Sequence, residues 1–296
     1  MQLRTILFSC LLAITLSMPD SSVAERLSAK SIERLLDSLS ASRWEETDSG
    51  ARPALLLGSR ILIDECGSYP YQSNGHRNEG FLNLAADLRE GLGQGLMCMA
   101  GHGAPGRLHP FHEKNARRLV DLLNDESGKI LRCVEDQTFA YAVAHPSKSP
   151  AVPHEILIDT YRISGFLSRR FDRQTYCDFF KLSDPLIEDH LTGKPLHLDG
   201  MHRYRNLPGL LFHEVTHWLG FEHTNLTADV VDLYETCCFG GSDHILDEAV
   251  NRGFQQRACN ILRDEELWEA DAATRKRLWQ QKGYYRLKRE IRASRP

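Results

Sequence analysis

The stretch LPGLLFHEVTHWLGFEH, at residues 207–223, determines how the whole chain is interpreted. Pro208 is tolerated in the first turn of a helix, because its missing N–H would be unpaired there in any case. His213 and His217 are four residues apart, so a helix places their rings on one face, one turn apart. Glu214 lies at the edge of that face. The apolar side chains fall on the opposite side and can anchor the helix in a core: Leu211, Phe212, Val215, Trp218 and Leu219. Two imidazoles on a rigid, buried helix are well suited to bind zinc.

A third ligand has to come from beyond this helix, since a straight helix would carry later side chains away from the metal. Gly220 can adopt the left-handed conformation that ends a helix and turns the chain back. His223, three residues later, can then reach the same ion. Three neutral imidazoles with an open fourth position are typical of a catalytic zinc site. The sequence therefore predicts His213, His217 and His223 as zinc ligands, with Glu214 as the catalytic residue.

This segment resembles the HExxHxxGxxH signature of the metzincin zinc endopeptidases over eleven residues, with all five fixed positions present. The resemblance implies a zincin-like fold, a Zn2+ cofactor and a protein or peptide substrate. It also implies that zinc polarises a water molecule and stabilises the oxyanion of the tetrahedral intermediate. Glu214 would take the proton of that water during attack on the scissile carbonyl, then pass it to the leaving amine.

The chain departs from the metzincin pattern in one respect. Metzincins place a methionine in a tight turn beneath the zinc, downstream of the third histidine, whereas this chain has no methionine after Met201. The turn-like run CCFGG at residues 237–241 is the candidate for that place, with a sulfur or a ring as the apolar floor. The family resemblance is accordingly that of a divergent metzincin without the Met-turn methionine.

The missing methionine keeps a second ligand scheme open. In thermolysin-like zincins the third ligand is a glutamate on a following helix. The pattern predicts such a helix over residues 227–236, and Glu235 lies 18 residues after His217. Glu235 is therefore the alternative third ligand. If His223 is the ligand, Glu235 or Asp232 is expected to orient a histidine from behind.

The remaining pattern predicts an α+β fold, with a small twisted mixed sheet and helices above the zinc and a helical C-terminal lobe below it. Apolar periodicity predicts helices over residues 24–40, 81–92 and 113–124, strands over 60–64, 129–134, 138–144 and 155–161, and a helical chain from residue 165 onward. The run 155–161 is the candidate edge strand for an extended substrate. Acidic residues 264–266 and basic residues 275–277 mark the two ends of the last helix.

The first 24 residues have the pattern of a signal peptide. Arg4 precedes an apolar run, residues 5–18, that is too short to span a bilayer, and Ser22-Val23-Ala24 offers small residues for cleavage. We therefore expect a secreted or periplasmic protein without a transmembrane segment. Residues 25–296 are expected to form a single zincin-like catalytic domain, in which residues 25–55 can be a pro-segment or an N-terminal extension.

Seven cysteines follow the predicted signal peptide, and none of them form a CxxC pair. In an oxidising compartment this number predicts up to three disulfides with one thiol left over. The net charge of −4 argues against nucleic acid as the main partner.

The sequence predicts a secreted zinc-dependent endopeptidase, and two other functions stay open. One is a zinc amide hydrolase acting on cell-wall peptides, and the other is a non-catalytic secreted binding module stabilised by zinc. Tyr234 also has two interpretations. It can reach the zinc or the oxyanion, or it can be a core residue with a hydrogen-bonded hydroxyl.

Overall fold

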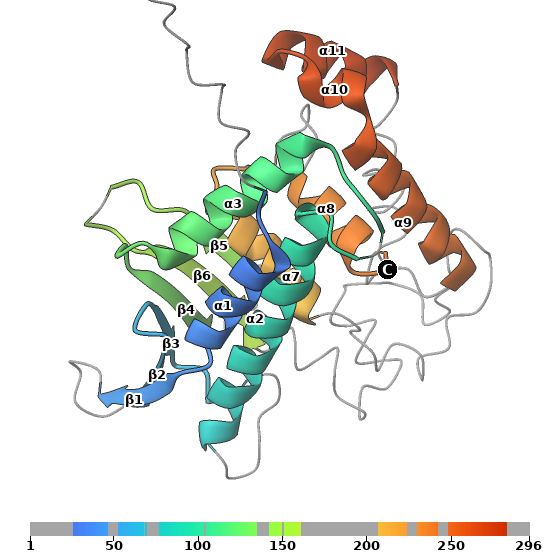
Figure 1. The fold of residues 1–296 in the computed structure, drawn as a ribbon. Helices are drawn as coiled ribbons and strands as arrows, with labels where there is room; N and C mark the ends of the chain where they lie inside the picture. The colour runs from blue at the N-terminus through green and yellow to red at the C-terminus, as the bar shows by residue number, and fades with distance from the viewer. Residues whose placement is uncertain are drawn as a thin grey trace, which may run out of the picture.

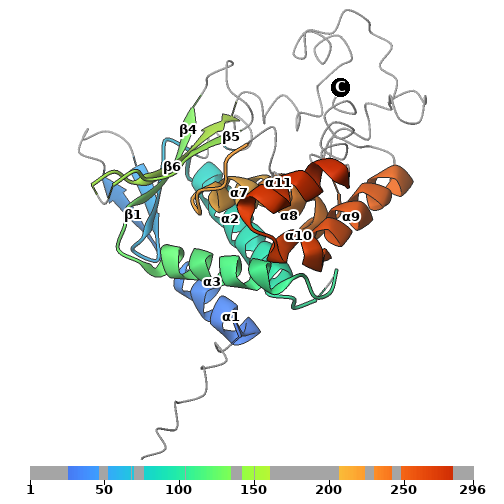
Figure 2. The same ribbon diagram turned by 90° about the horizontal axis from the view of Figure 1, so that it is seen from above.

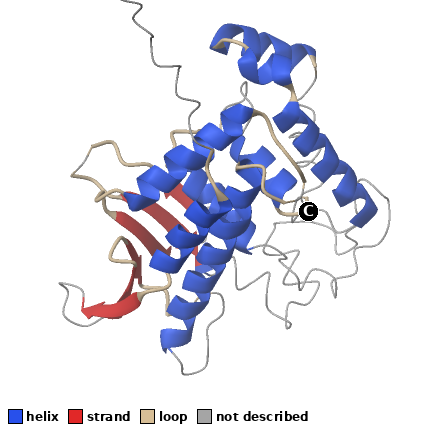
Figure 3. Cartoon of the chain, viewed as in Figure 1, coloured by secondary structure: helices blue, strands red, loops and turns tan. Residues whose placement is uncertain are grey.

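The computed structural model has an α+β fold, as the sequence predicts, with a six-stranded mixed sheet (Figures 1 and 3). It describes residues 26–46, 53–67, 69, 77–103, 105–134, 142–149, 151–160, 207–223, 230–241 and 248–282. The predicted signal peptide lies outside these residues. Among the helices within these ranges, none combines the length and the apolar character needed to cross a membrane.

The sheet has the strand order β1-β2-β3-β4-β6-β5. Its strands are β1 (Ser42–Glu46), β2 (Pro53–Leu57), β3 (Ile61–Asp64), β4 (Lys129–Val134), β5 (Ala142–His145) and β6 (His154–Asp159). The central strands β3, β4 and β6 are parallel, whereas β1, β2 and β5 pair antiparallel with their neighbours. Side chains alternate between buried and half-buried along the central strands, so one face of the sheet belongs to the core.

The prediction that residues 155–161 form an edge strand is wrong, because β6 lies between β4 and β5. The three aliphatic side chains of β6, Ile156, Leu157 and Ile158, suit a strand that pairs on both sides and is covered on one face. The outer strand is β5, which is only four residues long, as edge strands commonly are. The hairpin of β1 and β2 was not predicted, since its sequences, SRWEE and PALLL, lack the alternation of a half-buried strand.

Helices cover one face of the sheet and extend beyond it (Figure 2). They are α1 (Ala29–Ser38), α2 (Arg77–Met99), α3 (Pro110–Asn124), α7 (Leu207–His217), α8 (Val230–Cys238), α9 (Glu248–Arg263), α10 (Glu265–Glu269) and α11 (Ala272–Gln281). Helices α1, α2 and α3 lie against the sheet, while α9, α10 and α11 gather on the side away from β1 (Figures 1 and 2). Ile32, Leu35 and Leu39 are buried, so the segment 25–55 contributes side chains to the core.

The C-terminal part of the chain has two short helices, α10 and α11. The acidic residues 264–266 and the basic residues 275–277 predicted a single helix there. Asp264 accepts a hydrogen bond from the N–H of Leu267 and caps α10. Asp271 accepts from the N–H groups of Ala273 and Thr274 and caps α11 in the same way. A second capping aspartate inside the predicted helix therefore starts a new one.

Helix α7 is held in the core by its close approach to α2. A Cβ atom at Gly95 would lie 2.4 Å from the ring of Phe212, and one at Gly91 would lie 2.2 Å from the carbonyl oxygen of Pro208. Only glycine leaves room for α7 at these two points. As a result, the segment from Gly209 to His217 is buried along its whole length.

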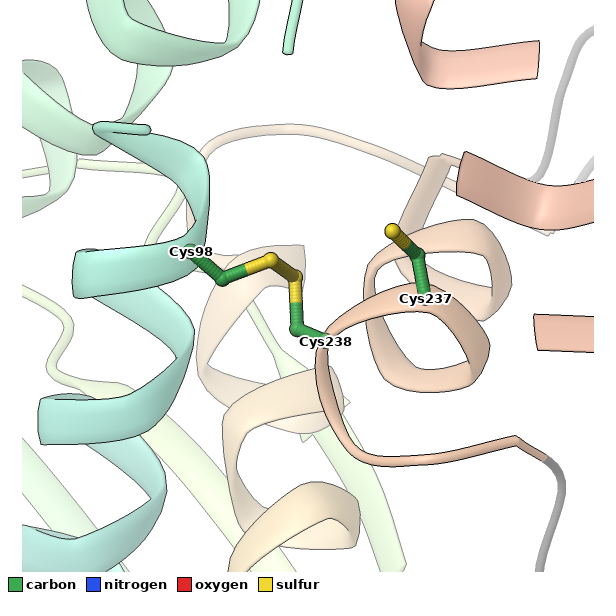
Figure 4. Close-up of side chains that lie close together, drawn as sticks. All are labelled: Cys98, Cys237 and Cys238. Carbon is green, nitrogen blue, oxygen red and sulfur yellow. A yellow bond between two sulfur atoms is a disulfide. The ribbon is translucent and has the colours of Figure 1, made fainter. Parts of the chain in front are cut away.

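Three disulfides join separate segments of the chain. Cys66 bonds to Cys133 in β4, Cys98 in α2 bonds to Cys238 in α8, and Cys237 in α8 bonds to Cys259 in α9. Figure 4 shows the link between α2 and α8. The prediction of up to three disulfides is confirmed, and Cys177 lies outside the described residues. Helix α8 is thus covalently attached to two neighbouring helices.

A buried polar network joins α3 to α8. The hydroxyl of Tyr234 lies 2.7 Å from Nδ1 of His112 and 3.4 Å from Nδ2 of Asn115, and all three side chains are buried. This confirms the core interpretation of Tyr234. Burial, together with the nearby charges of His109 and Arg275, lowers the pKa of His112 to about 3.

We predict that acid destabilises the fold through His112. Its folded-state pKa lies below the value of about 6.5 in the unfolded chain, so the unfolded state binds the proton first. The free energy of unfolding therefore keeps its full value above pH 6.5. It decreases as the pH falls toward 3, by up to about 1.4 kcal/mol per pH unit. Urea unfolding of the wild type and His112→Asn between pH 7.5 and 4.5 measures the effect. The variant should show the shallower pH slope, and parallel slopes would contradict the prediction.

We also predict that the double variant Cys98→Ala/Cys238→Ala loses about 3–5 kcal/mol of unfolding free energy. The bond closes a loop with a sequence separation of 140 residues, so its removal gives the unfolded chain much conformational freedom. Replacing both cysteines avoids a stray thiol. Denaturant unfolding gives the measurement, with Cys177→Ala as the matched control. Equal midpoints for the double variant and the wild type would refute the prediction.

Candidate metal centre

The candidate centre is built at the end of α7, where the chain reverses. The last turn closes with hydrogen bonds from the N–H groups of Trp218, Leu219 and Gly220, the last to the carbonyl of His217 at 2.9 Å. Gly220 has φ +86°, in the left-handed region that favours glycine. The predicted role of Gly220 is confirmed, because this turn returns His223 to the face that carries His213 and His217.

The three predicted histidines meet through their Nε2 atoms. Nε2 of His223 lies 3.3 Å from Nε2 of His213 and 3.2 Å from Nε2 of His217. Ligand nitrogens about 2.0–2.1 Å from a tetrahedral zinc are roughly 3.3–3.4 Å from one another. The three nitrogens therefore have the spacing of one metal ion. The side chain of His223 is 45% exposed while the other two rings are buried, so the centre is open to solvent on the side of His223.

The other ring nitrogens of the two helical histidines have acceptors that determine the tautomer. Nδ1 of His213 lies 2.7 Å from Oε2 of Glu235, and Nδ1 of His217 contacts the carbonyl oxygen of Phe221. Nδ1–H is the donor in each bond, which leaves the lone pair of Nε2 available to a metal. No sequence pattern signals the carbonyl of Phe221, because any residue could supply it.

The two acidic residues of α8 lie behind this triad. Glu235 contacts Nδ1 of His213, whereas Nε2 of the same ring meets His223. This is the orienting position that was expected of Glu235 if His223 is a ligand. Asp232 lies 3.8 Å from Nδ1 of His213 and 3.9 Å from Nδ1 of His223. His213, Asp232 and Glu235 also lie close enough to share an ion. We favour the three nitrogens, because the Glu235 contact already has the length of a hydrogen bond.

The electrostatics of the centre favour a cation. Burial disfavours a charged His213, but the hydrogen bond and the charge of Glu235, followed by the charges of Glu214 and Asp232, raise its pKa to about 9. The negative potential that favours a second proton on this ring also favours a metal ion at Nε2.

Glu214, the predicted catalytic residue, is buried beside the histidines. Burial raises its pKa, while the nearby His213 and His223 and a hydrogen bond from the main chain of Ala144 act in the opposite direction. Ala144 belongs to the edge strand β5, which packs against α7. Sequence reasoning missed this neighbour, because nothing in the run 142–145 indicates which helix it will approach.

A cluster of sulfur atoms beside α8 does not offer a thiolate metal site. The sulfurs of Cys98, Cys237 and Cys238 lie near one another, but all three are committed to disulfides. Figure 4 shows the bond between Cys98 and Cys238, with the sulfur of Cys237 separate from it. Cys237 and Cys238 begin the run 237–241 that was considered in place of the Met-turn. The ring of Phe239 in that run packs on Phe212 of α7, 5.6 Å between centroids.

Comparison of the chain with protein-family models, with curated proteins and with solved structures gives no match. The function is therefore inferred from the chemistry and geometry of the site.

We predict that the protein binds one zinc ion and that His223→Ala weakens this binding by more than about 100-fold, because it removes one of three nitrogen donors. Competition with a chromophoric chelator measures the affinity. Removing the metal from the wild type should also lower the thermal midpoint, since zinc binds the folded state selectively. Replacement of the exposed His145 is the control. An unchanged affinity in His223→Ala would exclude this histidine as a ligand.

Proposed function

We propose that the protein is a secreted or periplasmic zinc-dependent endopeptidase with a divergent zincin-like catalytic domain. The observation that supports this most strongly is the convergence of three Nε2 atoms beside the buried Glu214 of α7. Nε2 of His223 lies 3.3 Å from that of His213 and 3.2 Å from that of His217. Three histidines and one open position fit catalytic zinc, whereas structural zinc sites are usually closed by a fourth protein ligand. The metzincin signature adds support from the same residues.

In this proposal each residue has a distinct role. His213, His217 and His223 hold the ion through Nε2, and the carbonyl of Phe221 keeps His217 in the required tautomer. Zinc, when bound, supplies Lewis acidity that lowers the pKa of a coordinated water to about 7 and stabilises the oxyanion. Glu214 accepts the proton of the attacking water and transfers it to the leaving amine. No covalent intermediate with the protein is required.

The edge strand β5 is the proposed partner of an extended substrate. Its inner side pairs antiparallel with β6, while its other side is the outer edge of the described sheet. The hydrogen bond from Ala144 to Glu214 brings this strand next to the catalytic carboxylate. A peptide lying along β5 would gain main-chain hydrogen bonds and pass Glu214 with its scissile bond.

Three disulfides support the proposed location, because such bonds persist in oxidising compartments outside the cytoplasm. The mixed sheet with an antiparallel edge strand next to α7, and the helices beyond it, supports the zincin-like architecture. The disulfides also agree with the signal-peptide pattern of residues 1–24.

We predict that Glu214→Ala binds zinc as the wild type does but loses about 10²–10⁴-fold in peptide hydrolysis, because it lacks the general base. A casein assay and a peptide-library digest measure the loss, with metal analysis of the same samples. Glu222→Ala, an exposed glutamate beside His223, is the matched control and should stay active. A fully active Glu214→Ala would remove this residue from the mechanism.

The same assays separate the two alternatives. Hydrolysis of purified cell-wall material without cleavage of unfolded protein would favour a cell-wall amide hydrolase. Stoichiometric zinc without cleavage of any substrate would favour a binding module stabilised by the metal.

A further inference from the structure

Helix α8 presents two carboxylates to the rear of the histidine triad. Asp232 and Glu235 are three residues apart, so they lie on one face of the helix. Glu235 contacts Nδ1 of His213 at 2.7 Å. Asp232 lies between two rings, with Oδ1 3.8 Å from Nδ1 of His213 and Oδ2 3.9 Å from Nδ1 of His223. Both acids therefore face Nδ1 atoms, on the opposite side of the rings from the Nε2 atoms that meet.

Helix α8 itself is fixed firmly enough to act as a support. Its other face is buried, and the hydroxyl of Tyr234 lies 2.7 Å from His112 of α3. Its last two residues are bonded to α2 and α9 through Cys238 and Cys237. A carboxylate on such a helix holds its position without relying on the loop that carries His223.

His213 and His223 depend on the carboxylates of α8 to different degrees. His213 belongs to the buried helix α7, and its ring needs only a defined tautomer and rotation, which one short hydrogen bond provides. His223 follows the left-handed turn at Gly220 and its side chain is 45% exposed, so its ring is held by less packing than the buried ring of His213. A charge near its Nδ1 favours the orientation that directs Nε2 toward the other two rings.

We propose that Asp232 and Glu235 are positioning residues of the metal centre, with Glu235 orienting His213 and Asp232 orienting His223. This inference rests on the proposed zinc centre and extends it to α8. Glu235 raises metal affinity by selecting the Nδ1–H tautomer of His213, and both carboxylates add negative charge behind the ligands. They do not coordinate the ion.

The first test measures zinc affinity by chelator competition in the full mature protein. Glu235→Ala should bind zinc about 10–100-fold more weakly than the wild type, the usual effect of removing such a partner. Glu235→Gln, which keeps an acceptor oxygen, should recover part of the loss. Asp232→Ala should lose less zinc affinity than Glu235→Ala, because the contacts of Asp232 with the rings are longer. Glu222→Gln removes an exposed charge beside His223 and should keep its affinity within about twofold.

The second test separates positioning from coordination and from a general structural role. Co2+ bound to Glu235→Ala should keep the visible absorption of the wild-type centre, because all three nitrogens stay, whereas His223→Ala should change it. The Nδ1–H proton of His213, followed by NMR in the zinc-loaded protein, should lose its hydrogen-bonded downfield shift only when Glu235 is replaced. A helix that merely stabilised the fold would affect the thermal midpoint but not this resonance.

The outcomes distinguish failure of the proposed zinc centre from failure of the positioning roles. A wild type that binds no zinc overturns the proposed function and this inference together. A wild type that binds zinc, with Glu235→Ala and Asp232→Ala binding within about twofold of it, overturns the positioning roles alone. Loss of the cobalt spectrum in Glu235→Ala would make Glu235 a ligand and overturn its positioning role.

Discussion

The structure depends on one geometric constraint, which is that three imidazole nitrogens from two segments of chain must reach the same point. Helical spacing brings His213 and His217 to one face, but it cannot bring a third residue there. The reversal at Gly220 solves this problem, because its φ of +86° ends the helix and returns His223 to the first two rings. The surrounding packing serves the same constraint, since α7 has to stay buried and rigid for the nitrogens to keep their spacing.

Rigidity around the site comes from several independent sources. Close contact at Gly91 and Gly95 brings α2 against α7, while disulfides from Cys98 and Cys259 attach α8 to its neighbours. The hydrogen bond between Tyr234 and His112 adds a third attachment through α3. Side chains that orient metal ligands act only when their own positions are held, so this packing and the chemistry of the site are parts of one arrangement.

The differences between expectation and structure have identifiable physical causes. The hairpin of β1 and β2 was missed because short strands without alternation carry little signal of their own. The edge strand was assigned to residues 155–161, although strand order depends on pairing between distant segments, which periodicity does not report. The C-terminal helix was predicted as one because flanking charges mark outer ends, whereas the cap at Asp271 lies inside.

The sequence by itself determined the features that depend on local spacing. These are the α+β class, the central strands, the shared face of His213 and His217, and the break at Gly220, all of which follow from helical or strand geometry and from glycine's freedom at positive φ. It also limited the role of Glu235 to a ligand or an orienting residue. Only the tertiary structure placed Glu235 on Nδ1 of His213, β5 beside Glu214, and the six cysteines in pairs. These contacts join segments far apart in the chain, and their formation is decided by how the helices and strands pack together.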